Sequence, residues 1–217
     1  MKNQLNLKEL ERKAFRAIYQ DGLWDMYFGV IVICISIFVY RPETGYSAMN
    51  IILALCSMVV AYVLFWAGKK FIILPRMGQV RFGAQRKKRR FTLIIVLSVV
   101  VLIQIVLVAF QLLAWKNPEI GARFSSILPD RKVTDLVVAA IGALIVGPSM
   151  ILVAYFKDFP RGYFIAIMIA LAVFLMIYLN QPIYPIIIGA LIALPGLVLF
   201  VRFMQRYPLR QEEVPHE

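Results

Sequence analysis

Six runs of apolar residues, each long enough to cross a bilayer, constrain this chain more than any other feature of its sequence. They are residues 23–40, 49–67, 91–115, 133–156, 162–179 and 183–203. A helix needs about 17–25 residues to cross about 30 Å of hydrocarbon. Strands that span lipid must close into a barrel and show alternating segments of about 10 residues, which these runs lack. The sequence therefore predicts an all-α, polytopic integral membrane protein with six transmembrane helices.

Residues 68–90 form a polar, basic interruption between the second and third runs. This loop carries nine of the 24 Lys and Arg residues and no Asp or Glu. If the N-terminus is cytosolic, the connections on the inner side hold 19 Lys and Arg residues and those on the outer side hold five. Because positive residues concentrate on the cytosolic side of membrane proteins, we expect both termini in the cytosol.

The composition agrees with a lipid environment, and the positions of the basic residues explain the high net charge. The chain is 61% hydrophobic and 17% charged, with a mean hydropathy of +0.78, whereas ordinary domains are about 45–50% apolar and about 25% charged. The net charge of +12 comes from residues in the connections. The positive-inside bias accounts for them, so nucleic acid is not an expected partner.

The parts of the chain follow from these runs. Residues 1–22 should be cytosolic, with an amphipathic helix over 4–20 that either lies on an anionic membrane face or packs on the cytosolic loops. Residues 23–115 hold the first three membrane helices, 116–132 an external connection, 133–204 the last three helices and 205–217 a cytosolic tail.

Polar residues inside or beside the apolar runs are the first places to look for function, because charge at the bilayer centre is costly. Four are candidates for contacts in a cavity or within the bundle: Asp25, Gln104, Gln111 and Asp135. Asp25 and Asp135 are predicted in the first turn of their helices, where a carboxylate is favoured by the helix dipole. Gln104 and Gln111 share one face of the third helix and should form interhelical hydrogen bonds.

Basic residues of the 68–90 loop are the candidates for contact with anionic lipid or an acidic partner. They are Arg76, Arg81, Arg86, Lys87, Lys88, Arg89 and Arg90. Residues 75–82 are predicted to be extended, because Pro75 restricts its own φ and disfavours a helical Leu74. The run 86–90 should continue directly into the third helix.

Prolines and small residues predict where helices bend and approach each other. Pro148, Pro185 and Pro195 should interrupt the fourth and sixth helices, which raises a ligand cavity between those two helices as an alternative. Gly147 and Gly189 belong to small-residue stripes that favour close helix packing.

No enzyme signature is present in the sequence. His216, the single histidine, lies in the polar tail, so a Ser-His relay or a His-based metal site inside the helices lacks its base or ligand. No P-loop, GxSxG or EF-hand spacing occurs. We expect no catalysis, no metal and no cofactor.

Two short motifs carry a resemblance to a family. DGLWDMYFG leads into the first membrane helix and PRMGQVRFG lies in the basic loop. Together they resemble a family of bacterial multi-pass membrane proteins that has no assigned activity. The resemblance implies a bacterial inner-membrane location and supplies no site residues.

The resulting functional hypothesis is a non-enzymatic interaction or accessory component of the membrane, which presents its basic loop to anionic headgroups or to a membrane or cytosolic protein. The alternative is a small transporter or permease working through a cavity between the fourth and sixth helices.

Overall fold

The computed structural model describes residues 19–39, 48–77, 84–116 and 131–208, and these are helical apart from short turns, with no strand among them. The predicted all-α class is confirmed for this part of the chain. The predicted N-terminal amphipathic helix lies outside it except for Tyr19 and Gln20, which form a turn. The external connection 117–130 and the tail 209–217 also lie outside the described residues.

Four helices are long and apolar enough to cross a membrane. Their spans are Met49–Arg76, Lys132–Phe156, Pro160–Leu179 and Ile183–Arg206. The first and third of the six predicted runs appear as the shorter apolar helices Leu23–Ile37 and Phe91–Val106 within the residues searched. By length and composition, the described structure therefore supports four of the six predicted crossings.

The helices divide into two compact units, which are described separately. The first unit contains α2 (Leu23–Val39), α3 (Ala48–Ala67), η1 (Gly68–Ile73), α4 (Leu74–Met77) and α9 (Ile183–Arg206) from Ile186 onward. The second contains α5 (Ala84–Lys116), α7 (Arg131–Phe156) and α8 (Pro160–Leu179).

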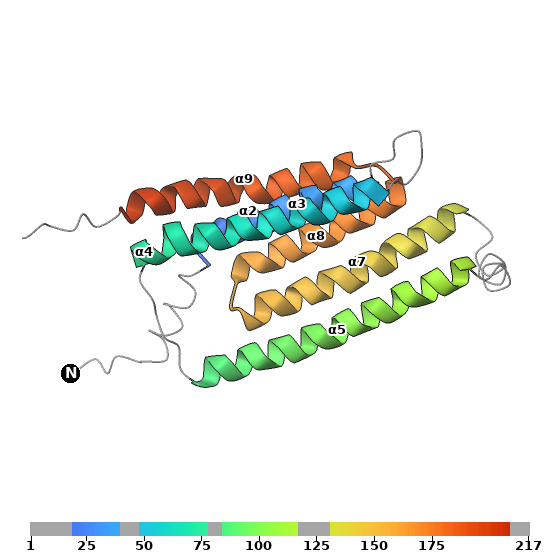
Figure 1. Cartoon of the computed structure of the whole chain (residues 1–217), viewed down its shortest axis with the longest axis horizontal. Coiled ribbons are helices and arrows are strands. Elements are labelled where there is room, and N and C mark those ends of the chain that lie inside the picture. The colour runs from blue at the N-terminus through green and yellow to red at the C-terminus, as the bar shows by residue number, and fades with distance from the viewer. Residues whose placement is uncertain (1–18, 40–47, 78–83, 117–130, 209–217) are drawn as a thin grey trace, which may run out of the picture. The chain divides into compact units, whose positions relative to one another are not determined.

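In the first unit, α9 lies alongside α2 and α3 (Figure 1). Glycines permit this approach, because a Cβ on Gly29 would lie 2.6 Å from the Gly189 carbonyl oxygen, and one on Gly189 would lie 2.6 Å from the Gly29 oxygen. Contacts this short exclude any side chain, so the predicted close packing at Gly189 is confirmed. Leu23, Ile73, Phe200 and Phe203 form a buried hydrophobic cluster in this unit.

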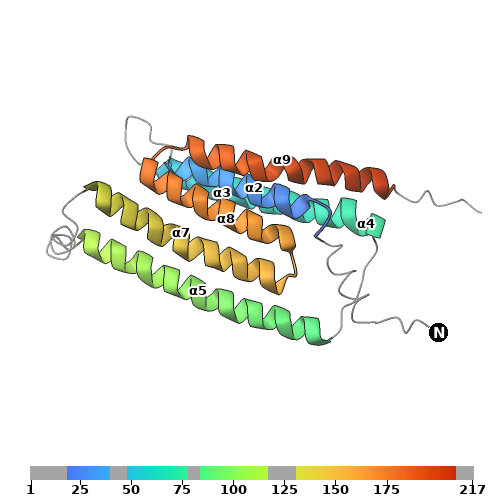
Figure 2. The same ribbon diagram turned by 180° about the vertical axis from the view of Figure 1, so that it is seen from behind.

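In the second unit, α7 lies between α5 and α8 (Figure 2). α7 and α8 form a helical hairpin whose turn is closed by a hydrogen bond from Phe159 N–H to the Ala154 oxygen at 2.9 Å. Pro160 begins α8, where its missing N–H costs no helical bond. A Cβ on Gly147 would lie 3.1 Å from the Ala170 Cβ, so the stripe predicted on this helix also faces a neighbour.

Hydroxyl groups within the apolar helices are satisfied locally. Ser36 donates to the Ile33 oxygen at 2.6 Å, Ser57 to the Ala54 oxygen at 2.8 Å, and Ser149 to the Ile145 oxygen at 2.6 Å. Each bond returns to the preceding turn of the same helix, so the hydroxyl needs no partner from lipid or from another helix.

The predicted extended segment at residues 75–82 is wrong for its first three residues. α3, η1 and α4 follow one another without a break from Ala48 to Met77, and Leu74 is helical with φ −58° and ψ −44°. η1 is a π-helix, in which Leu74 N–H donates to the Lys69 oxygen, five residues back. This wider turn comes directly before Pro75, whose ring would clash with a carbonyl in a regular α-helix. Residues 78–83 lie outside the described structure.

Two of the three prolines lie inside helices, where their predicted bends stay predictions, and the interruption predicted at the third is wrong. Pro148 and Pro195 lie inside α7 and α9. Pro185 is the third residue of α9, where the backbone N–H has no intrahelical acceptor, so it interrupts nothing.

Candidate functional site

A buried ion pair lies at the beginning of α2. Asp21 is completely buried, and one of its carboxylate oxygens pairs with the ammonium group of Lys69, whose side chain is 20% exposed. Its other oxygen accepts a hydrogen bond of 3.0 Å from Leu23 N–H. This second bond is an Asx-type turn that places a negative charge at the positive end of the α2 dipole. The pair therefore fixes the beginning of α2 to the first residues of η1.

Close backbone contact with α9 holds the same end of α2. Gly22 has φ +76°, a left-handed conformation that suits glycine, and a Cβ there would lie 2.2 Å from the Gly196 oxygen. A Cβ on Gly196 would in turn lie 2.8 Å from the Asp25 Cβ. Asp25 is 4% exposed and lies in the first turn of α2, as predicted.

Aromatic rings cluster around Trp24, beside the ion pair. The Trp24 ring centroid lies 4.6 Å from that of Phe65, 5.6 Å from Phe28 and 5.8 Å from Tyr19. The Lys69 ammonium lies 6.0 Å from the centroid of the Trp24 ring, within the range of a cation–π contact. The low-polarity surroundings strengthen the attraction between Lys69 and Asp21.

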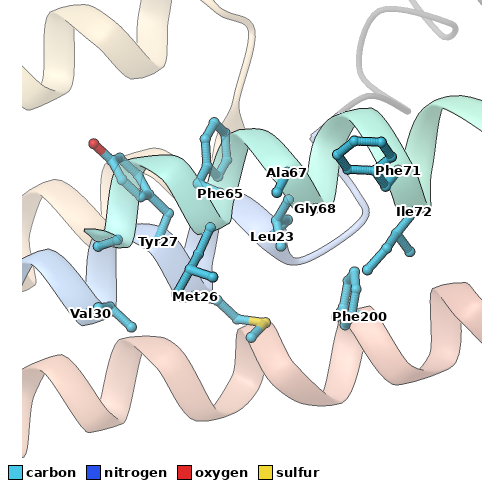
Figure 3. A pocket seen from close by; sticks show the side chains of 12 residues that line it. Leu23, Met26, Tyr27, Val30, Phe65, Ala67, Gly68, Phe71, Ile72 and Phe200 are labelled. Atoms are coloured by element: carbon cyan, nitrogen blue, oxygen red, sulfur yellow. The ribbon is translucent and has the colours of Figure 1, made fainter. Parts of the chain in front are cut away.

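An open apolar groove of about 440 Å³ lies beside this cluster, between α2, the α3–η1 helix and α9. Its volume lies within the range of about 300–1,000 Å³ that is typical of ligand pockets. Leu23, Met26, Phe65, Phe71 and Phe200 are among the residues that line it. Figure 3 shows Ile72 and Phe200 pointing toward one another from opposite helices at one end, with Val30 and Tyr27 at the other.

Lys70 brings a positive charge to the Phe71 end of this groove. Its ammonium lies 4.9 Å from the Trp66 ring centroid and 5.5 Å from that of Phe71. The side chain is exposed, and no carboxylate in the part of the chain that the structure describes pairs with it. Lys70 was not among the residues predicted to contact lipid.

The structure gives Arg76 an intramolecular contact. Its Nη1 donates to the Met204 carbonyl oxygen at 3.3 Å, in the last turn of α9. Carbonyl groups at a helix C-terminus lack intrahelical partners and favour a cation. Arg76 therefore caps α9, and its contact with lipid headgroups stays a prediction.

The other predicted basic contacts are only partly described. Arg81 lies outside the described residues. The run 86–90 forms the first turns of α5, as predicted, and Lys88 is exposed there. The side chains of Arg86, Lys87, Arg89 and Arg90 lie outside the description, so their contact with lipid stays a prediction.

The four polar candidates do not form one site in the structure. Asp25 belongs to the first unit, and Gln104, Gln111 and Asp135 belong to the second. Asp135 is the fifth residue of α7 and is exposed, so its predicted place in the first turn is wrong, because the helix begins earlier, at Arg131. Gln104 is partly exposed, and the side chain of Gln111 is not described.

Two further possible sites are a metal centre and the predicted cavity between α7 and α9. Within the residues searched, no group of three or more His, Cys, Asp or Glu side chains could hold a metal ion. α7 and α9 belong to different units, so the cavity predicted between them stays untested, and the groove described above lies within the first unit. The arrangement at α2 is suited to binding an apolar group beside a positive charge.

Sequence reasoning missed the Asp21–Lys69 pair, although a usable pattern was present. Asp21 lies two residues before the first apolar run and Lys69 lies two residues after the second. Consecutive antiparallel helices place these two positions at the same end, where opposite charges can meet.

The chain matches no family model, no curated protein and no solved structure.

Proposed function

We propose that this chain is a multi-pass protein of a bacterial inner membrane that crosses the bilayer six times, with both termini in the cytosol. In this proposal it is a non-enzymatic interaction or accessory component. It binds anionic headgroups, or an acidic partner protein, through basic residues at the cytosolic ends of its helices. The resemblance of DGLWDMYFG and PRMGQVRFG to a bacterial membrane-protein family is part of the proposal.

The observation that carries the proposal is the concentration of positive charge at the α3–α5 connection. Nine Lys and Arg residues fall in 68–90 with no acidic residue among them. Lys70 and Lys88, on either side of this connection, are exposed. Attraction to an anionic leaflet contributes about 1 kcal/mol for each basic residue near the surface.

The groove also favours this function over transport of a polar solute. Its lining side chains are apolar, and Phe65, Phe71 and Phe200 contribute large rings to it. Removing a hydrated ion from water into such surroundings is costly. An apolar chain has no such penalty.

The test removes charge from the beginning of α5. Arg86→Gln, Lys87→Gln and Lys88→Gln together leave Arg89 and Arg90 to maintain orientation. Retention of phosphatidylglycerol by the purified protein is then measured at low and high salt. We expect retention at low salt to fall by at least about tenfold, and the difference to shrink at high salt, because salt screens exposed charge.

The matched control carries Arg123→Gln, Arg131→Gln and Lys132→Gln, which remove three charges from the predicted outer side. It should retain phosphatidylglycerol as the parent does. If the α5 variant equals the parent at both salts, the basic run acts only as a topology determinant and the proposed function is wrong.

A further inference from the structure

The groove in the first unit has the length and the direction that a site for a lipid chain requires. Leu23 and Val30 both line it and are seven residues apart on α2, which corresponds to about 10 Å along the helix axis. Half of a bilayer's hydrocarbon is about 15 Å thick. Because α2 begins at Leu23, the groove extends from the cytosolic end of the helix into the inner leaflet in the proposed topology.

Among the residues that the structure describes, the charged side chain in contact with the lining of the groove is Lys70, which lies at one end. Phe71, which lines the wall, is also the ring against which the Lys70 ammonium lies, at 5.5 Å. Figure 3 places Phe71 and Ile72 at the end opposite Val30 and Tyr27. An amphiphile with its anionic group at Lys70 would therefore have its apolar part directed along the groove toward Val30.

Two of the neighbouring basic residues have other contacts, which favours Lys70 as the residue that meets the ligand. The Lys69 ammonium is paired with Asp21, and Arg76 donates to the Met204 oxygen. Both contacts hold the walls of the groove together, since they join η1 to the beginning of α2 and α4 to the end of α9. The π-helical turn over Gly68–Ile73 contributes Gly68, Phe71 and Ile72 to the lining. Such turns occur frequently at functional sites.

We propose that this groove binds one acyl chain of an anionic phospholipid of the inner leaflet, with the lipid phosphate at the Lys70 ammonium. The proposal rests on the membrane orientation in the proposed function, and it names a particular lipid site. Charge complementarity at Lys70 and the apolar lining select this occupant. Basic pockets between membrane helices on the cytoplasmic side are known places for such headgroups.

The experiment uses the full chain in nanodiscs of phosphatidylglycerol and phosphatidylcholine. The probe is phosphatidylglycerol with a photoreactive diazirine in one acyl chain, and the matched probe is phosphatidylcholine with the same chain. We expect phosphatidylglycerol to label Met26, Phe65 or Phe71, with the labelled residue identified by mass spectrometry, in excess over phosphatidylcholine. Lipid-facing positions outside the groove, such as Val63, should show no such preference.

Two variants and two controls locate the site. Lys70→Gln should reduce the preference for phosphatidylglycerol about fivefold, and Lys132→Gln should not change it. Leu64 lines the groove and the neighbouring residue Val63 does not. Leu64→Trp should therefore fill the groove and reduce its labelling by both probes, whereas Val63→Trp should not. Leu64 and Val63 are 66% and 54% exposed, so neither substitution should disturb folding.

Equal labelling by the two probes at the groove, or an unchanged preference in Lys70→Gln, would overturn the proposed site. That result leaves the α5 charge-removal experiment to decide the proposed function separately. Loss of phosphatidylglycerol retention in the α5 variant with an unaffected groove preference would show that the two sites are independent, which is the result we expect.

Discussion

The ion pair between Asp21 and Lys69 contributes to the stability of the first unit. Asp21 is fully buried and Lys69 is 20% exposed. The Asp21 carboxylate therefore needs its counter-ion more than the Lys69 ammonium does. Loss of Lys69 leaves a buried carboxylate without its counter-ion. Loss of the Asp21 charge leaves an ammonium that retains some access to solvent.

Lys69→Met is therefore expected to lower the free energy of unfolding by roughly 3–5 kcal/mol, the usual range for breaking a buried pair. Asp21→Asn should lower it less, because the amide oxygen can still accept from Leu23 N–H. The double variant, Asp21→Asn with Lys69→Met, should be more stable than Lys69→Met alone, because it leaves no unpaired buried carboxylate. Unfolding in detergent measures all three, with exposed Lys88→Met as the control. A double variant that is no more stable than Lys69→Met would mean that the pair contributes through packing alone.

The sequence predicted the ends of those helices that are set by the length of an apolar run, and it did not predict the helix end that is set by packing. The described bounds of α7, α8 and α9 agree closely with the predicted runs 133–156, 162–179 and 183–203. The second run was predicted to end at residue 67, and residues 75–82 were predicted to be extended. However, Ile72 and Ile73 pack with Leu23 and Phe200, and the π-turn accommodates the proline, so the helix continues. Local restrictions before proline cannot reveal that long-range contact.

Glycine contacts give a second prediction, at the scale of helix pairs. Gly29→Ala should destabilise the protein by about 1–3 kcal/mol, because its Cβ would lie 2.6 Å from the backbone of α9. Gly189→Leu should be worse, and Gly147→Leu should also destabilise. Gly142→Ala is the control, since its Cβ would meet the Ile177 Cδ1 at 3.0 Å, the end of a flexible side chain. Equal thermal stability of Gly29→Ala and Gly142→Ala in detergent would contradict the close α2–α9 packing.

At the scale of the whole molecule, the sequence predicts membrane insertion well and the site poorly. Apolar length and charge distribution are properties of the chain alone, and they lead to helices that can cross a bilayer. The groove and the Asp21 pair depend on α2, α3 and α9 meeting, and residues 23 and 200 are far apart in the sequence. The apolar lining of the groove has the same composition as any lipid-facing surface, so no sequence pattern distinguishes it.

The number of crossings decides whether the basic residues face the cytosol. With six crossings, residues 78–83 are cytosolic and residues 40–47 are external. If only the four longest helices cross, with the N-terminus cytosolic, residues 40–47 are cytosolic and 78–83 are external. That arrangement would place the nine basic residues of 68–90 on the outside, against the positive-inside bias.

Fusions of a reporter that is active only outside the cytosol test this claim most directly, when placed after Glu43, Gly83 and Pro208 in separate chains. The account predicts activity after Glu43 and silence after Gly83 and Pro208. Silence after Glu43 together with activity after Gly83 would show four crossings, and activity after Pro208 would show an odd number. The first result would contradict a basic cytosolic surface that binds the inner leaflet, and the second would contradict six crossings.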